Sequence, residues 1–217
     1  MSAFVQNLIA IPSDYAFGGS VTSWPGGSGT GPLPAMSIRS GDSVFVYVSH
    51  ASNPTTLNLT DSAGNTYIPL SWQNINGGSC WFYCLNATPY MNNVITINRT
   101  GTSVSYLSGT ALRFTGGRYR ALDTEVSTFN NSPVLTCTSP SFSTTSAGII
   151  LAGAFCSSGN WYSNNGMTLN NGITLVSDAT GFVTCGYKIT TSAQIGQTIT
   201  NTGTSIGQRM INVAAFK

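Results

Sequence analysis

The stretch SVFVYVSH, residues 43–50, sets β-branched and aromatic side chains next to one another with few polar breaks. Such a run predicts a strand that is buried on both faces in the centre of a sheet. The stretch AGIILAGAFC, residues 147–156, has the same character, and Gly153 within it indicates a bulge or a close approach of packed groups. Both segments favour a fold that is built from β-strands.

Shorter segments of the same kind occur along the rest of the chain. Apolar residues alternate in VITIN, residues 94–98, and in RMINVAAF, residues 209–216, which is typical of half-buried strands. Strands are also predicted at residues 4–11, 66–72, 80–86, 93–98, 104–114, 122–128, 134–138, 181–190, 197–201 and 208–216. Turn residues separate them, as at residues 61–65 (DSAGN) and 170–172 (NNG), and no useful helical periodicity is present. The sequence therefore predicts an all-β protein, an antiparallel β-sandwich of jelly-roll type.

The length of 217 residues suits one β domain, and we expect a single β-sandwich domain over residues 1–217. Residues 18–34 read GGSVTSWPGGSGTGPLP and are rich in glycine and proline. We expect this segment to be an extended surface loop that is held in place by Trp24. The predicted strand at residues 4–11 is too short to form a domain of its own.

Charged residues make up only 6% of the chain, against about a quarter in a typical soluble domain. Enzymes draw most of their acids, bases and metal ligands from residue types that are scarce here, so the composition predicts that the protein is not an enzyme. The only local basic group is Arg113, Arg118 and Arg120, which gives nucleic-acid binding little support. No apolar run is long enough for a transmembrane helix, and the N-terminus does not resemble a secretory signal.

Five cysteines are present, an odd number that argues against an obligatory disulfide framework. Cys80 and Cys84 would lie on one face of a strand, about 13 Å apart, which is too far for a disulfide. We predict buried free thiols and no bound metal or cofactor.

A few residues deserve weighing as catalytic or metal-binding groups. His50 ends an apolar strand with no evident orienting carboxylate, so a structural role is favoured. Asp123 and Glu125 would share one face of a strand, and we interpret them as solvated charges at a sheet edge, which could also meet Arg118 or Arg120 in a subunit interface. Asp61 carries the only carboxylate of its segment, so it indicates a turn and not a calcium loop.

Aromatic residues could instead form a sugar-stacking platform. Trp72 and Trp81 lie in predicted strands and are expected in the core, whereas Trp161 and Tyr162 fall in the polar segment SSGNWYSNNG. The candidate contacts to a partner or a glycan are Trp24, Trp161, Tyr162, Arg118 and Arg120.

Four motifs in order along the chain resemble a recurrent β-sandwich module. They are SGDSVFVYV (residues 40–48), TDSAGNTY (60–67), AGIILAGAF (147–155) and the terminal AAFK (214–217). The chain is similar in these motifs to jelly-roll modules of tailed-phage structural proteins and of bacterial surface proteins.

The resemblance implies a non-enzymatic structural or adhesive role. Because the chain is nearly all one such module and shows no export signal, we expect a virion protein of the kind that decorates and cements a phage head. For such a decoration protein we expect a homotrimer, the major capsid protein as partner, and a place on the capsid surface after assembly in the host cytoplasm, with no membrane partner. The alternative is a carbohydrate- or receptor-binding module of a phage tail fibre or a bacterial surface protein. That alternative would use loops such as residues 157–165.

Overall fold

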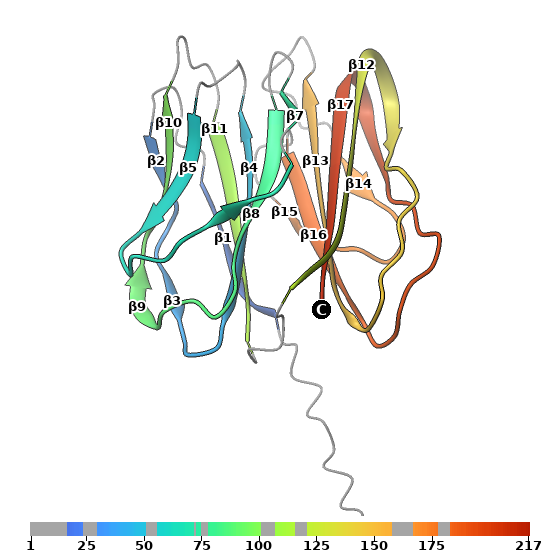
Figure 1. Ribbon diagram of the computed structural model, residues 1–217. Coiled ribbons are helices and arrows are strands. Elements are labelled where there is room, and N and C mark those ends of the chain that lie inside the picture. Colours follow the sequence, from blue (N-terminus) through green and yellow to red (C-terminus); the bar gives the residue numbers. More distant parts are fainter. Residues whose placement is uncertain are drawn as a thin grey trace, which may run out of the picture.

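The computed structural model is built from antiparallel β-sheets, which confirms the predicted all-β class (Figure 1). The structure describes residues 17–23, 30–50, 56–71, 73–74, 78–100, 107–115, 121–157, 167–177 and 183–217. Two portions of similar size lie side by side, and we call residues 17–115 the N-terminal half and residues 121–217 the C-terminal half.

The N-terminal half holds eleven of the described strands. They are β1 (Phe17–Ser23), β2 (Thr30–Pro32), β3 (Met36–Ile38), β4 (Ser43–His50), β5 (Thr56–Asp61), β6 (Ile68–Pro69), β7 (Gln73–Asn74), β8 (Gly78–Cys84), β9 (Tyr90–Asn93), β10 (Ile95–Thr100) and β11 (Leu107–Phe114). One sheet has the order β1-β11-β4-β8-β6, with β7 also paired to β8. A smaller sheet, β2-β10-β5, and the pair β3-β9 cover its outer face.

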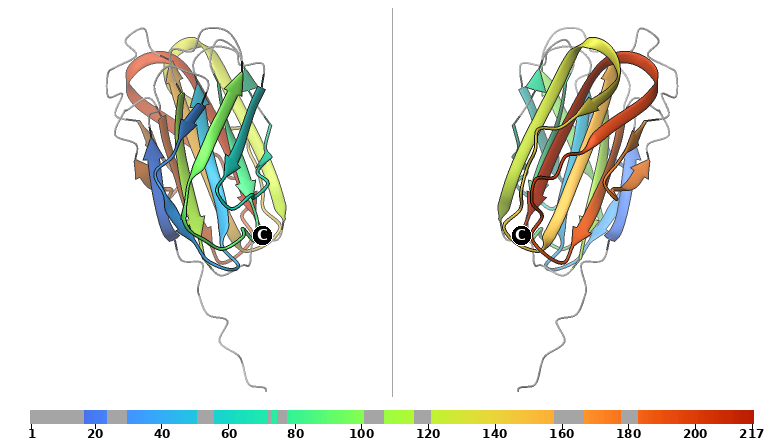
Figure 2. Two further views of the ribbon diagram at one scale, coloured as in Figure 1. Left: turned by 90° about the vertical axis from the view of Figure 1, so that its left-hand side faces the viewer. Right: turned by 90° about the vertical axis from the view of Figure 1, so that its right-hand side faces the viewer.

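The C-terminal half repeats this arrangement with fewer and longer strands. They are β12 (Leu122–Thr138), β13 (Gly148–Ser157), β14 (Thr168–Leu169), β15 (Thr174–Ser177), β16 (Val183–Thr190) and β17 (Thr200–Phe216). Their order is β12-β17-β13-β16-β15, with β14 paired to β17. Both β12 and β17 arch over one end of the half and continue on its outer side (Figures 1 and 2).

Pairing registers show that the two halves are equivalent strand by strand. In the N-terminal half, Phe45 of β4 lies opposite Leu112 of β11 and Tyr83 of β8. The C-terminal counterpart is Leu151 of β13, opposite Ala214 and Tyr187 of β17 and β16. The strands β1, β4, β8 and β11 thus correspond to β12, β13, β16 and β17, and corresponding strands run in the same direction (Figure 1).

An irregularity in the first strand of each half supports this equivalence. The register of β1 against β11 shifts between Phe17 and Gly19. The register of β12 against β17 shifts between Leu122 and Thr124. A bulge adds one residue and redirects the side chains that follow it, and here it recurs at the same place in both halves.

Three hydrophobic cores follow from the layers. The alternating faces of β4 supply two of them, because Phe45 and Tyr47 point between the halves while the three valines point to the outer sheet. The first core joins both inner sheets, the second lies inside the N-terminal half, and the third lies inside the C-terminal half. This double burial explains why every residue of β4 is buried, as its continuous apolar run predicts.

Reciprocal ring contacts hold the two halves together. The rings of Tyr83 and Phe216 have centroids 5.0 Å apart, and those of Phe114 and Tyr187 are 5.1 Å apart. Each contact is the counterpart of the other, which is the property of an interface with two-fold symmetry. At another pair of equivalent positions, Tyr47 lies against Gly153, where a Cβ would overlap its ring. The close approach predicted at Gly153 is confirmed.

Some sequence-based boundaries need correction. Residues 18–34 are not one irregular loop, because β1 and β2 occupy parts of the segment and pair with β11 and β10. The separate strands predicted at residues 122–128 and 134–138 form the single strand β12, and residues 200–216 form the single strand β17. The turns at residues 61–65 and 170–172 are confirmed, with positive φ at Gly64, Asn171 and Gly172. The predicted strand at residues 4–11 lies outside the described residues.

Candidate functional site

The five residues predicted as contacts to a partner or a glycan, Trp24, Arg118, Arg120, Trp161 and Tyr162, lie outside the residues that the structure describes. Their role stays a prediction. Trp72 also lies outside the described residues, whereas Trp81 is buried in the core between the halves, as predicted.

His50 is the last residue of β4, and its side chain is fully buried. Backbone pairing places it between Leu107 of β11 and Gly78 of β8. A fully buried side chain at the centre of a sheet cannot meet a substrate from solvent. The position therefore agrees with a structural role.

Asp61 organises the turn that follows β5. Its Oδ1 accepts hydrogen bonds from the backbone N–H groups of Ala63 (3.1 Å) and Asn65 (2.9 Å). Its Oδ2 accepts from the Asn65 amide (2.7 Å), the Tyr67 hydroxyl (2.9 Å) and the Asn93 amide (2.9 Å). With five donors from the protein, the carboxylate is committed to the turn, as the sequence indicates.

The pKa of the Asp61 carboxyl reflects these contacts. Burial alone would raise this pKa, but the hydrogen bonds from Asn65, Asn93 and Tyr67 favour the ionised form and lower the pKa below its usual value of 3.8. The pKa of the Tyr67 hydroxyl is raised by burial and by the neighbouring Asp61 charge. The turn is thus stabilised by a carboxylate that stays charged at neutral pH.

The expectation that Asp123 and Glu125 share one face of a strand is wrong. β12 is indeed an edge strand, but the bulge between Leu122 and Thr124 places Asp123 out of the regular alternation. Asp123 accepts hydrogen bonds from the backbone N–H and hydroxyl of Thr145 (2.6 and 2.7 Å) and lies 3.2 Å from the Lys217 Nζ. Glu125 turns instead toward the N-terminal half.

All five cysteines are free and buried, which confirms the sequence prediction. Burial raises the pKa of the Cys84 thiol to about 11, and the charge of Asp61 adds to the effect. Burial likewise raises the pKa of Cys80, Cys137 and Cys156. Because the thiolate is the form that attacks electrophiles and binds metals, burial disfavours the reactive form of these four thiols.

A buried polar cluster crosses the interface between the halves. The Tyr47 hydroxyl donates to Ser79 Oγ (2.7 Å), and the Asn212 amide donates to the same oxygen (2.7 Å) and to the Ser79 carbonyl (3.3 Å). The Trp81 indole N–H donates to the Asn212 carbonyl (3.4 Å). Burial raises the pKa of Tyr47, although the bonds to Ser79 and Asn212 oppose the shift. The cluster ties β4 and β8 of one half to β17 of the other, although the buried Asn212 side-chain oxygen accepts no hydrogen bond from the described residues.

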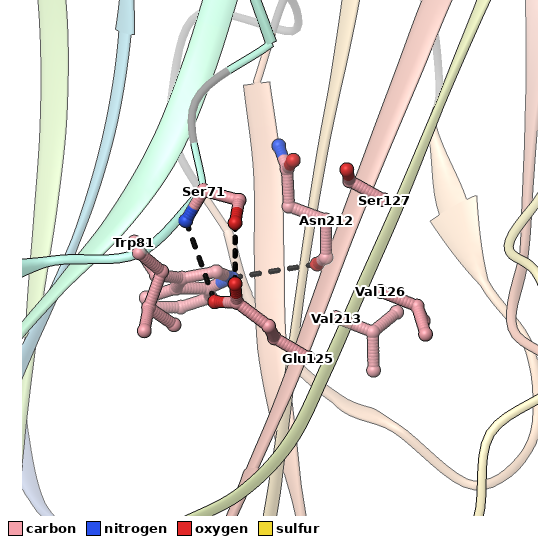
Figure 3. Close-up of a pocket in the computed structure, with 8 residues that line it drawn as sticks. Ser71, Trp81, Glu125, Val126, Ser127, Asn212 and Val213 are labelled. Carbon is pink, nitrogen blue, oxygen red and sulfur yellow. Dashed lines mark hydrogen bonds between the residues drawn. The ribbon is translucent and has the colours of Figure 1, made fainter.

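A cavity of about 180 Å³ opens at the seam beside this cluster (Figure 3). Its lining residues are Leu70, Ser71, Trp81, Glu125, Val126, Ser127, Asn212 and Val213. The Ser71 hydroxyl donates to Glu125, and the Ser71 backbone N–H donates to the same carboxylate at 3.3 Å. These bonds link β12 to the chain that follows β6 and close part of the seam.

The cavity between the halves is lined by an indole, a carboxylate and an amide, but its geometry does not suit the stacking of a sugar ring on the indole. Trp81 is only 1% exposed, and its ring centroid lies 4.9 Å from that of Tyr47. The volume of the cavity is also below the roughly 300–1,000 Å³ of typical ligand pockets. The cavity is therefore a packing gap between the halves and offers no aromatic platform to a sugar.

Within the described ranges, no group of three or more His, Cys, Asp and Glu side chains is placed to hold a metal ion. Nor does this part of the chain contain a helix of the length and apolarity needed to cross a membrane. Comparisons with family models, with curated proteins and with solved structures each gave no match.

Sequence reasoning missed the polar residues that join the halves. Ser79 and Asn212 lie in strands that are otherwise apolar, GSCWFYC and RMINVAAF, and both are buried. A polar residue at a core position is the signal that could have identified them, since a buried polar group needs a partner.

Proposed function

We propose that this chain is a non-enzymatic structural protein of a phage virion, which decorates the capsid by contacts to the major capsid protein. We further propose that each half is a jelly roll. Counting β2 with β3, β6 with β7 and β9 with β10, the N-terminal half has eight strands. Its inner sheet has the order first, eighth, third, sixth, fifth and its outer sheet the order second, seventh, fourth. This order fits two interlocked Greek keys except at the short fifth strand, which pairs with the inner sheet.

The observation that carries the proposal is that the described carboxylates bind other groups of the same protein. All four in the described part are engaged within the protein, since Asp42 accepts from the Arg39 backbone N–H (2.8 Å) and pairs with Arg113 (3.6 Å). The other three bind Asn65, Thr145 and Ser71 and their neighbours. General acid–base catalysis needs a carboxylate that faces substrate, whereas these four tie loops and strands together.

A mostly uncharged surface also supports a role in assembly. Interface cores are depleted in charged residues, and only 6% of this chain is charged. The proposed location is the outer surface of a head assembled in the host cytoplasm, and the proposed assembly is a homotrimer. Neither nucleic acid nor membrane is among the proposed partners.

Heads of the phage that carries this gene, prepared with the gene deleted, provide the test. Purified protein should co-sediment with these heads and saturate at a fixed number of copies per capsid subunit. Absence of binding, together with reproducible glycan-array binding that Trp161→Ala removes, would favour the sugar-binding alternative. Neighbouring genes offer a second check, since the proposal expects a major capsid gene and the alternative expects tail genes.

A further inference from the structure

Two large apolar side chains stand almost fully in solvent, one in each half. Met91 at β9 is 80% exposed, and Ile195, between β16 and β17, is 82% exposed. No other large apolar side chain in the described ranges is exposed to this degree. We call Met91 and Ile195 the apolar tips. A single exposed apolar residue is ordinary, but a matched pair calls for an explanation.

The apolar tips occupy the same position in the two halves. Two residues after the first tip, Asn93 lies opposite Met36. Two residues after the second tip, Gln197 lies opposite Phe142. The backbone next reaches β10 in one half and the first part of β17 in the other, and these two segments correspond in register, whereas the later part of β17 corresponds to β11. The two tips are therefore counterparts by chain geometry as well as by exposure.

The turns that present the apolar tips share an uncommon backbone conformation. The residue directly after each tip has a positive φ, 57° at Asn92 and 59° at Gly196. Asparagine and glycine are the residues that adopt this conformation most readily. The surrounding sequences differ, TPYMNN against SAQIGQ, and yet an apolar residue followed by a left-handed one is kept in both.

Both apolar tips lie at one end of the molecule. They follow β8 and β16, which are antiparallel to β4 and β13, and β4 and β13 run in the same direction (Figure 1). Neither TPYMNN (residues 88–93) nor SAQIGQ (residues 192–197) contains a charged residue. This end of the molecule thus carries both apolar tips, each in an uncharged segment at an equivalent position.

We propose that the apolar tips insert into two equivalent apolar pockets of a protein surface that presents the same pocket repeatedly. A shell of identical subunits has this property, so the inference rests on the proposed function and names the docking residues for it. Two apolar tips on one molecule bind such a surface more tightly than either tip could alone, because the second contact forms at a high effective concentration. Since the apolar tips are uncharged, the affinity should depend little on the salt concentration.

Met91→Ser, Ile195→Ser and the double variant test the inference by co-sedimentation with the same gene-deleted heads. Each single change should weaken binding about ten- to hundred-fold, as expected for one buried apolar side chain. The double variant should lose binding by the product of the two factors or more. Ile206→Ser is the matched control, because Ile206 is 61% exposed but lies outside the tips, and it should bind like the unmodified chain. All variants should keep the thermal unfolding midpoint, because the replaced side chains make little contact.

The outcomes separate the two proposals. If the unmodified chain fails to bind heads, the capsid function fails and the docking inference fails with it. If the unmodified chain binds and the double variant binds equally well, the capsid function stands and the docking inference is overturned. Binding of the unmodified chain to neutral phosphatidylcholine vesicles, lost in the double variant, would also overturn it by assigning the tips to a membrane surface.

Discussion

The two halves of this molecule share a geometry but not a chemistry. At the turn after β5, the N-terminal half places Asp61, whose carboxylate accepts a hydrogen bond from the amide of Asn93. At the equivalent place, the C-terminal half has Asn171, whose amide donates to Gln197 at 2.9 Å. The same link is therefore made once with a charged acceptor and once with neutral amides, so the fold requires a hydrogen bond there and not a charge.

A buried arginine also differs in its position in the sequence between the two halves. Arg99 of β10 is 4% exposed in the N-terminal half, and its equivalent in β17 is Gly203. The C-terminal half supplies its arginine from Arg209, whose guanidinium covers Gly203 and donates to Val134 and Asn201. A Cβ at Gly203 would overlap this guanidinium. An arginine therefore fills this position in both halves, but it comes from β10 in one half and from the later part of β17 in the other.

The largest expected effect comes from the two phenylalanines of the reciprocal ring contacts between the halves. Phe114→Ala and Phe216→Ala should each lower the free energy of unfolding by about 3–5 kcal/mol, because both remove a fully buried aromatic ring from the core between the halves. Chemical denaturation measures both values. If one variant cost much less than the other, the two contacts would not be counterparts in energy.

Gly153→Ala should lower the free energy of unfolding by about 1–3 kcal/mol, because the added methyl group overlaps the Tyr47 ring. The same change in a Tyr47→Ala background should cost much less, since the overlapping ring is then gone. A double-mutant cycle by denaturation gives the coupling between the two positions. Additive effects would contradict direct packing of Tyr47 on Gly153.

Asp61→Asn should cost about 1–1.5 kcal/mol at pH 7, because an amide nitrogen replaces one oxygen that accepts hydrogen bonds. The native pKa of Asp61 is lowered, so its contribution is complete above the unfolded value near 3.8 and is lost as the pH falls through the native value. Unfolding curves from pH 6 to pH 2 should therefore show a smaller acid-induced loss in Asp61→Asn than in the unmodified chain. Equal losses would exclude this carboxylate as a source of acid sensitivity. Asn171→Ala is the neutral counterpart and should leave the pH dependence unchanged.

Lys217→Ala should have the smallest effect, below about 1 kcal/mol. The Lys217 side chain is 43% exposed, and exposed ion pairs contribute little. Asp123 keeps its two hydrogen bonds to Thr145 in this variant. Added salt should reduce even this difference, as measured by the thermal midpoint.

The sequence predicts the parts of the fold that one strand determines by itself. The apolar run of β4, the small residue Gly153 and the turn at Asp61 all depend on local periodicity or turn chemistry. The equivalence of the halves could not be read in this way. It lies in pairing registers between distant strands, while the aligned side chains differ, as Tyr47 differs from Gly153.

Side chains near the predicted site show the same limit. Asp123 and Glu125 were expected on one face because strict alternation was assumed, and the bulge after Leu122 breaks that alternation. The polar cluster of Ser79 and Asn212 forms only when the two inner sheets meet, so its members are 133 residues apart in the sequence. Local patterns do not report contacts of this range.

The packing of Tyr47 on Gly153 limits how two halves of this kind can be assembled. Two copies of one sequence related by the same axis would bring either two phenol rings into one space or two glycines around a void. The observed pairing of tyrosine with glycine needs two different sequences in a one-to-one ratio, and a single polypeptide supplies both at any dilution. Joining the halves covalently is what permits the asymmetry at their centre.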